Sequence, residues 1–205
     1  MNSYILNKIK SLSLNLENCN VYTEGASGAY LLNPIVAALA GAREVYCQIN
    51  DSRFGSFSQV EKKLFKAATD FGVKDRLKIF KNRDLNLLSQ SDIITNSGHV
   101  RPIDRQLLDV LKKSAVLPLM WETWELRESD FDINLCKEKQ ILVLGTEEHE
   151  EPNDMTMYNG WIGLKILFEL GFDGGDVLII GSPRNLTKPM QAMMKDIGCE
   201  VTLIG

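Results

Sequence analysis

Short runs of β-branched and apolar residues alternate along this chain with longer helical segments, and this alternation limits its possible folds more than any other feature. Helices of about 10–15 residues between successive strands imply parallel pairing with right-handed crossovers. The strands are apolar on both faces, as expected when helices cover both sides of a sheet. Strands are predicted at residues 20–24, 44–50, 77–80, 91–96, 115–120 and 140–144, and helices at 30–40, 59–71 and 103–113. We therefore predict an α/β protein with a doubly wound parallel sheet of the Rossmann or flavodoxin type.

The pattern changes after a polar, acidic loop at residues 146–154. A helix is predicted at 157–170, in which Gly160 and Gly163 permit close backbone approach. A strand at 176–181, a helix at 185–197 and a strand at 199–205 follow. We predict two domains, residues 1–150 and 151–205, the second being the start of another nucleotide-binding βαβ unit. Because two strands and one helix bury little apolar area, we expect further chain or a partner chain to complete it, and we favour truncation.

Composition and charge exclude several classes of protein. The 205 residues carry a net charge of −4 with a pI near 5.3, which argues against a nucleic-acid or membrane-surface binder. No apolar run approaches the roughly 18 residues of a membrane span. Lysines interrupt the apolar N-terminal stretch, so we expect no signal peptide and a cytoplasmic protein. The four cysteines form no CxxC pair, which predicts reduced thiols and no metal site.

The first candidate ligand site is a glycine turn between the first strand and the first helix. Gly25 and Gly28 would let backbone N–H groups approach a phosphate or a carboxylate. Asp51, at the end of the next strand, has the position of an acid that accepts hydrogen bonds from a ribose. The G-x-G-x-x-G fingerprint is absent, so a tight turn in an ordinary βαβ unit remains the alternative interpretation.

The second candidate site is the segment Gly181-Ser182-Pro183-Arg184-Asn185. It has the position of a dinucleotide-binding turn, and Gly181 matches the first glycine of the fingerprint. Pro183 has no N–H to donate, but Arg184 can contact a phosphate instead. The alternative is a Rossmann-like packing unit with an altered or lost ligand.

Two loops at the carboxyl ends of predicted strands contain the two histidines. His99 lies between Ser97 and Arg101, and His149 follows Glu148. Ligands bind at this edge of an open α/β sheet, so we predict catalytic roles for both histidines as general acid or base. Ser97, Arg101 and Glu148 are predicted to bind substrate. Solvated loops are the alternative for both segments.

Residues 90–205 resemble the two-domain NAD-dependent dehydrogenases of the D-2-hydroxyacid and formate dehydrogenase type, and more distantly S-adenosylhomocysteine hydrolase. The likeness rests on the run from SDIITNSGHVRPID to ILVLGT, on the helix YNGWIGLKILFELG and on DVLIIGSPRNLTKPMQAMMKDIGCEVTLIG. It implies NAD or NADP in a cleft between two domains, with Gly181 and Arg184 at the pyrophosphate. The family's catalytic Arg, Glu and His are not placed on residues of this chain.

Residues 20–80 also resemble the first half of a methyltransferase-type fold, which implies S-adenosylmethionine at Gly25, Gly28 and Asp51. The leading hypothesis is therefore an NAD(P)-binding, dehydrogenase-like protein with a small-molecule ligand. The second is a transferase that uses S-adenosylmethionine or a nucleotide. The third is a non-catalytic Rossmann-like subunit that forms a homodimer or is completed by a partner chain.

Overall fold

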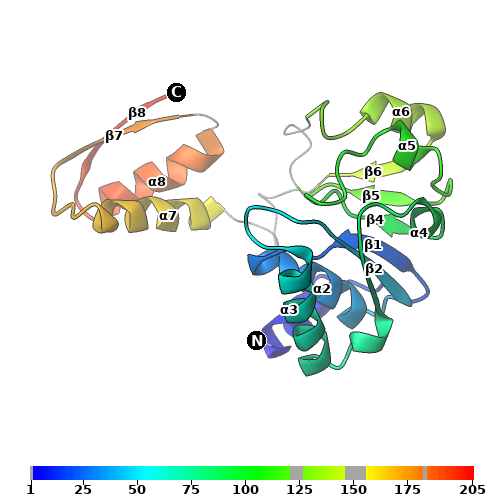
Figure 1. Ribbon diagram of the computed structural model, residues 1–205. Helices are drawn as coiled ribbons and strands as arrows, with labels where there is room; N and C mark the ends of the chain where they lie inside the picture. Colours follow the sequence, from blue (N-terminus) through cyan, green and yellow to red (C-terminus); the bar gives the residue numbers. More distant parts are fainter. Residues whose placement is uncertain (1, 121–126, 146–155, 182–183) are drawn as a thin grey trace. The chain divides into compact units, whose positions relative to one another are not determined.

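The computed structural model describes residues 2–120, 127–145, 156–181 and 184–205 (Figure 1). The chain divides into two compact units, unit 1 (Met1–Thr146) and unit 2 (Glu147–Gly205). The strands are β1 (Asn20–Glu24), β2 (Glu44–Ile49), β3 (Leu77–Lys81), β4 (Ile93–Ile94), β5 (Val116–Pro118), β6 (Leu142–Leu144), β7 (Asp176–Ile180) and β8 (Glu200–Ile204). The helices are α1 (Asn2–Ser11), α2 (Asn33–Leu39), α3 (Phe57–Asp70), α4 (Leu85–Ser89), α5 (Arg105–Leu108), α6 (Ile133–Lys139), α7 (Thr156–Glu169) and α8 (Arg184–Asp196), with 3₁₀ turns η1 (Gly28–Leu32) and η2 (Lys74–Arg76).

The sheet of unit 1 has six parallel strands in the order β3-β2-β1-β4-β5-β6. This is the Rossmann order 3-2-1-4-5-6, in which the chain starts in the middle, builds one half and crosses back to build the other. The predicted doubly wound parallel sheet is confirmed. The topological switch point lies between β1 and β4, where ligands bind in such sheets.

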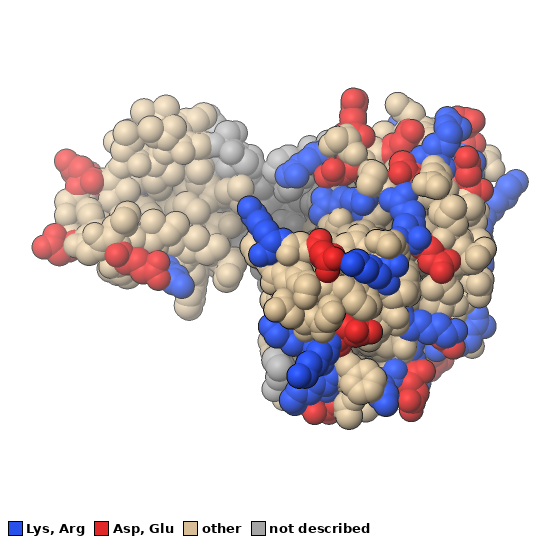
Figure 2. Space-filling view, viewed as in Figure 1, with Lys and Arg blue, Asp and Glu red and all other residues tan. Residues whose placement is uncertain are grey.

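Alternate residues of each strand point to opposite sides of the sheet of unit 1, and helices pack on both faces. On one face α2 and α3 pack against Val21, Val45 and Cys47. On the face of α2 and α3 this cover does not reach β6, where Leu142 and Leu144 are 52% and 49% exposed. On the other face α4, α5 and α6 pack against Tyr22 and Tyr46. Figure 2 shows positive and negative side chains intermixed over the visible surface of this unit.

Unit 2 consists of the parallel pair β7-β8 with α7 and α8. Its small core joins Leu167 of α7 to Met194 of α8. A Cβ atom added to Gly160 would lie 2.6 Å from Met193 Sδ, and one added to Gly163 would lie 2.9 Å from Met190 Cγ. The glycines therefore let α7 approach α8 closely, as predicted. No helix among the described residues is long and apolar enough to cross a membrane.

The structure differs from the predicted elements in four places. The helix predicted at 103–113 is only α5, after which bonds such as Leu111 N–H to Leu108 O (3.4 Å) form single turns. The short helices α4 and α6 were not predicted. The strand predicted at 91–96 is assigned only as β4, although Asp92, Thr95 and Asn96 continue its backbone pairing with β1 and β5.

Candidate functional site

His99 lies in the loop that follows β4, at the switch point of the sheet, and hydrogen bonds hold it on three sides. The carboxylate of Glu24 accepts a bond from the His99 backbone N–H at 2.7 Å. The Gln48 amide donates to the His99 carbonyl at 2.6 Å. The backbone N–H of Asn50 donates to His99 Nδ1 at 3.2 Å. The peptide and the ring of His99 are thus both positioned, and we call Glu24, Gln48 and Asn50 the His99 clamp.

The clamp forms because β1 and β2 place polar residues at their carboxyl ends. Glu24 and Gln48 are paired in the β1-β2 register and are only 3% and 2% exposed. The Tyr22 hydroxyl donates to the Gln48 side chain at 2.7 Å and accepts from the backbone N–H of Asp84 at 3.2 Å. Burial raises the pKa of Tyr22 to about 12, so its hydroxyl remains a donor at neutral pH. Gln48 is thereby oriented toward His99.

The clamp determines which ring nitrogen of His99 carries the proton. Nδ1 accepts from Asn50, so the neutral ring has its proton on Nε2. Among the described residues, none forms a hydrogen bond with Nε2. The arrangement therefore presents an N–H donor at the switch point, suited to an oxygen atom of a ligand.

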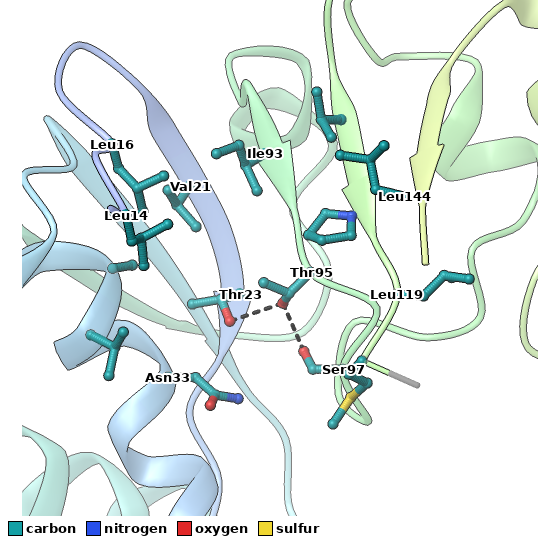
Figure 3. Close-up of a pocket in the computed structure, with 15 residues that line it drawn as sticks. Leu14, Leu16, Val21, Thr23, Asn33, Ile93, Thr95, Ser97, Leu119 and Leu144 are labelled. Carbon is teal, nitrogen blue, oxygen red and sulfur yellow. Dashed lines mark hydrogen bonds between the residues drawn. The ribbon is translucent and has the colours of Figure 1, made fainter. Parts of the chain in front are cut away.

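A cavity of about 510 Å³ lies beside β1, β4 and β5 (Figure 3). Its walls are mainly aliphatic, whereas Asn33 and three hydroxyl groups lie together toward one end. Thr95 Oγ1 donates to Thr23 Oγ1 at 2.9 Å and lies 3.0 Å from Ser97 Oγ. Ser97, predicted to bind substrate, thus lines a cavity as a member of a hydroxyl cluster.

Asn96, between two members of this cluster, is fully buried. Neither its amide oxygen nor its amide nitrogen has a hydrogen-bond partner in the described part of the chain. A buried amide with no partner is costly, and a bound water or a ligand atom is the usual partner in such places.

Of the predicted residues at the first glycine turn, Gly25 is explained by packing. A Cβ atom there would lie 2.8 Å from Cys47 Sγ and 3.1 Å from Leu64 Cδ2. Gly28 has a φ of +67° and open space around it, so its conformation favours glycine. Burial raises the pKa of the Cys47 thiol, which keeps it protonated.

Asp51 is exposed at the end of β2, where the sequence places it. One carboxylate oxygen accepts from the backbone N–H of Phe57 and the other from Lys81 Nζ, both at 2.6 Å. The Lys81 hydrogen bond, followed by that of Phe57, holds the pKa of Asp51 below its usual value. Asp51 is therefore an ionised acceptor that a ribose hydroxyl can reach from solvent.

Arg101 forms an ion pair with Asp130 at 3.1 Å, with both side chains about a quarter exposed (23% and 27%). Within unit 1, the carboxylate of Asp130 would therefore compete with a ligand for the Arg101 guanidinium. Asp130 lies shortly before α6 and was not predicted as a site residue.

The remaining predicted residues belong to unit 2 or to its boundary. Glu148, His149 and Ser182 lie outside the described residues, as do the side chains of Arg184 and Asn185. Gly181 follows β7 and donates its N–H to Ile204 of β8 at 2.9 Å. Within the described ranges, no group of three or more His, Cys, Asp or Glu residues is arranged to bind a metal.

The clamp residues Glu24, Gln48 and Asn50 were not predicted as site residues, and neither were Thr23 and Thr95 of the hydroxyl cluster. A signal for both was present, because Thr23, Glu24 and Gln48 are polar residues at the ends of strands that are otherwise apolar. A buried polar residue is more informative about a site than an exposed one.

No protein-family model matches the sequence, and no curated protein matches it. Among solved structures, shikimate 5-dehydrogenase from Listeria monocytogenes in complex with shikimate and NAD is 16% identical with a TM-score of 0.50, covering 70% of this chain and 51% of that chain. Quinate dehydrogenase from Corynebacterium glutamicum in complex with NAD is 11% identical, with a TM-score of 0.47 and coverages of 70% and 49%. A dipicolinate synthase chain from Bacillus halodurans is 14% identical, with a TM-score of 0.47 and coverages of 82% and 51%. The chain spans about half the length of these proteins. The likeness to the first shows a shared Rossmann-type α/β fold.

Proposed function

We propose that this chain is an NAD(P)-binding, dehydrogenase-like protein whose dinucleotide binds at the carboxyl edge of the unit 1 sheet. The observation that carries the proposal is the strand order 3-2-1-4-5-6, with the positioned His99 at its switch point. The solved shikimate dehydrogenase with this type of fold contains NAD, which supports the choice of cofactor.

The residues at this edge suit the parts of a dinucleotide. Asp51, at the end of β2, accepts from the hydroxyls of the adenosine ribose. Lys81, 2.6 Å from the Asp51 carboxylate, provides a cation for the extra phosphate of NADP. When bound, the nicotinamide would supply hydride transfer. The chain itself would contribute His99 Nε2–H, which donates to the oxygen of the reacting group.

This proposal needs only unit 1. The expectation that Gly181 and Arg184 meet the pyrophosphate, with the ligand between the two domains, remains a prediction. Neither the geometry of unit 1 nor the comparisons add support for S-adenosylmethionine.

Thermal melting of the whole chain with millimolar NAD, NADH, NADP or NADPH tests the proposal. At least one of the four should raise the melting temperature, since a ligand that binds only the folded state stabilises it. Asp51→Ala should weaken binding about tenfold, because a charged acceptor for the ribose is lost. If none of the four dinucleotides shifts the transition, the proposal is wrong.

Asp70→Ala is the matched control. Asp70 is as exposed as Asp51 (59% and 56%) and also pairs with a lysine at 2.6 Å, but it lies at the end of α3. Its replacement should leave dinucleotide affinity unchanged.

A further inference from the structure

The cavity beside β1, β4 and β5 lies on the opposite face of the sheet from the His99 clamp. Val21 and Thr23 of β1 line it, whereas Tyr22 and Glu24 alternate to the other face and support the clamp. Its volume of about 510 Å³ falls within the roughly 300–1,000 Å³ of sites that bind small organic molecules. Such sites combine apolar walls with a few placed polar groups, as this one does.

Counting protons shows what the hydroxyl cluster offers to a ligand. Each hydroxyl has one proton, and Thr95 donates its proton to Thr23. The 3.0 Å contact between Thr95 and Ser97 must then use the proton of Ser97. This leaves the proton of Thr23, which has no acceptor among the described residues, at the wall of the cavity. A ligand that faces Thr23 should therefore carry a hydrogen-bond acceptor.

The cavity also lacks charge. None of the described residues that line it is Lys, Arg, Asp or Glu. A carboxylate in this cavity would lose its hydration without gaining a cation, which is costly. The acceptor should therefore belong to a neutral group.

From the proton count and the missing charge, we propose that this cavity binds a neutral small molecule with an apolar body and one oxygen acceptor, a ketone, an aldehyde or an alcohol. The inference goes beyond the proposed function, because the cavity and His99 lie on opposite faces of the sheet, and it does not rest on dinucleotide binding.

Three probes with one aromatic skeleton test the chemistry on the whole chain without any dinucleotide. They are 2-acetylnaphthalene, a neutral ketone; 2-naphthoate, a carboxylate; and 2-ethylnaphthalene, which has no acceptor. Binding is measured by calorimetric or fluorescence titration. The ketone should bind roughly fivefold or more tightly than either of the others, the difference one hydrogen bond can make.

Variants of Thr23 and Ser97 test which hydroxyl of the cluster has its proton free for a ligand. Thr23→Val removes the free donor and should weaken ketone binding roughly fivefold. Ser97→Ala leaves Thr95 and Thr23 in place and should change it less than about twofold, since no bond to the ligand is lost. Neither variant should change the affinity for 2-ethylnaphthalene. Thr69→Val, on the exposed surface of α3, is the control for a remote hydroxyl.

Leu144→Trp tests the location and does not depend on the buried hydroxyls. Leu144 lines the cavity but is 49% exposed, so a larger side chain can be accommodated without repacking the core. It should weaken all probes that bind. The inference is overturned if no probe binds, if naphthoate binds as tightly as the ketone, if Thr23→Val and Ser97→Ala cause equal losses, or if Leu144→Trp has no effect. If the probes bind in the expected order but no dinucleotide binds, the inference about the cavity is supported and the proposed dehydrogenase function is refuted.

Discussion

Asn96 is the side chain in unit 1 whose burial most needs an explanation. It is fully buried at the carboxyl end of β4, and both polar atoms of its amide lack a partner in the described part of the chain. A protein retains such a group when it serves binding more than stability. Asn96→Leu keeps the branched shape and removes the polar atoms, so it should raise the free energy of unfolding by about 1 kcal/mol or more. Urea denaturation measures the change.

Asn20→Leu is the matched control for this prediction. Asn20 is also buried, but its amide donates to the Gln90 carbonyl at 3.0 Å and accepts from Arg43 Nε at 3.0 Å. The same substitution there should destabilise the protein by about 1–3 kcal/mol, because it leaves partners unpaired. An equal decrease in the free energy of unfolding for Asn96→Leu and Asn20→Leu would contradict the interpretation of Asn96.

Because of Tyr22, the stability of the folded protein should depend on pH in the alkaline range. Its pKa is raised from 10.0 to about 12, mainly by burial, so the folded protein retains the phenol proton where the unfolded chain loses it. Stability from this group is complete below pH 10 and decreases as the pH rises toward 12, by about 2–3 kcal/mol in total. Tyr22→Phe should remove this part of the decrease in a series of denaturation curves between pH 9 and 12. A parallel decrease in both proteins would refute the assignment.

At the scale of elements, Gly25 fixes the approach of β1 to β2 and α3. A methyl group at this position would contact Cys47 Sγ at 2.8 Å and Leu64 Cδ2 at 3.1 Å. Gly25→Ala should therefore destabilise the protein by about 1–3 kcal/mol through overpacking. Adding Cys47→Ala should recover part of this loss, with a coupling of about 1 kcal/mol in a double-mutant cycle.

Gly28→Ala provides the comparison for this cycle. The cost there should come from its φ of +67° and not from a clash, because the space around it is open. Cys47→Ala should therefore give it no relief. If relief is found at Gly28 and not at Gly25, the packing explanation is wrong.

The sequence predicted elements well where the local pattern was long and failed where it was short. β1 was predicted with its full bounds, because its β-branched residues lie between polar and glycine-rich segments. The helix α6 has only seven residues, so its apolar spacing gave no clear period, although Asp132 caps it through the backbone N–H of Leu135. Its aspartate cap was the available signal.

At the scale of the whole molecule, the contacts that join the parts of the site could not be predicted, because those parts come from distant segments. His99 is 75 residues from Glu24 and 49 from Asn50. The periodicity of each segment showed that the strands are parallel, but the strand order depends on crossovers that join far ends of the chain. The loop of His99 was predicted as a site, whereas the residues that orient its ring were found only in the structure.

A dinucleotide can be proposed to bind at either of two places, the carboxyl edge of the unit 1 sheet or the turn at Gly181 in unit 2, and a fragment of unit 1 distinguishes them. Unit 1 has a six-stranded sheet with helical cover and a core on each face, so a fragment of residues 1–146 should fold by itself with a cooperative transition. If the dinucleotide binds at Asp51 and the switch point, the fragment should retain its affinity to within about threefold, because the proposed contacts remain. Calorimetric titration of the fragment and of the whole chain gives the comparison. Loss of binding in a folded fragment would favour the turn at Gly181 and Arg184 as the cofactor site and would leave His99 with a role in binding substrate alone.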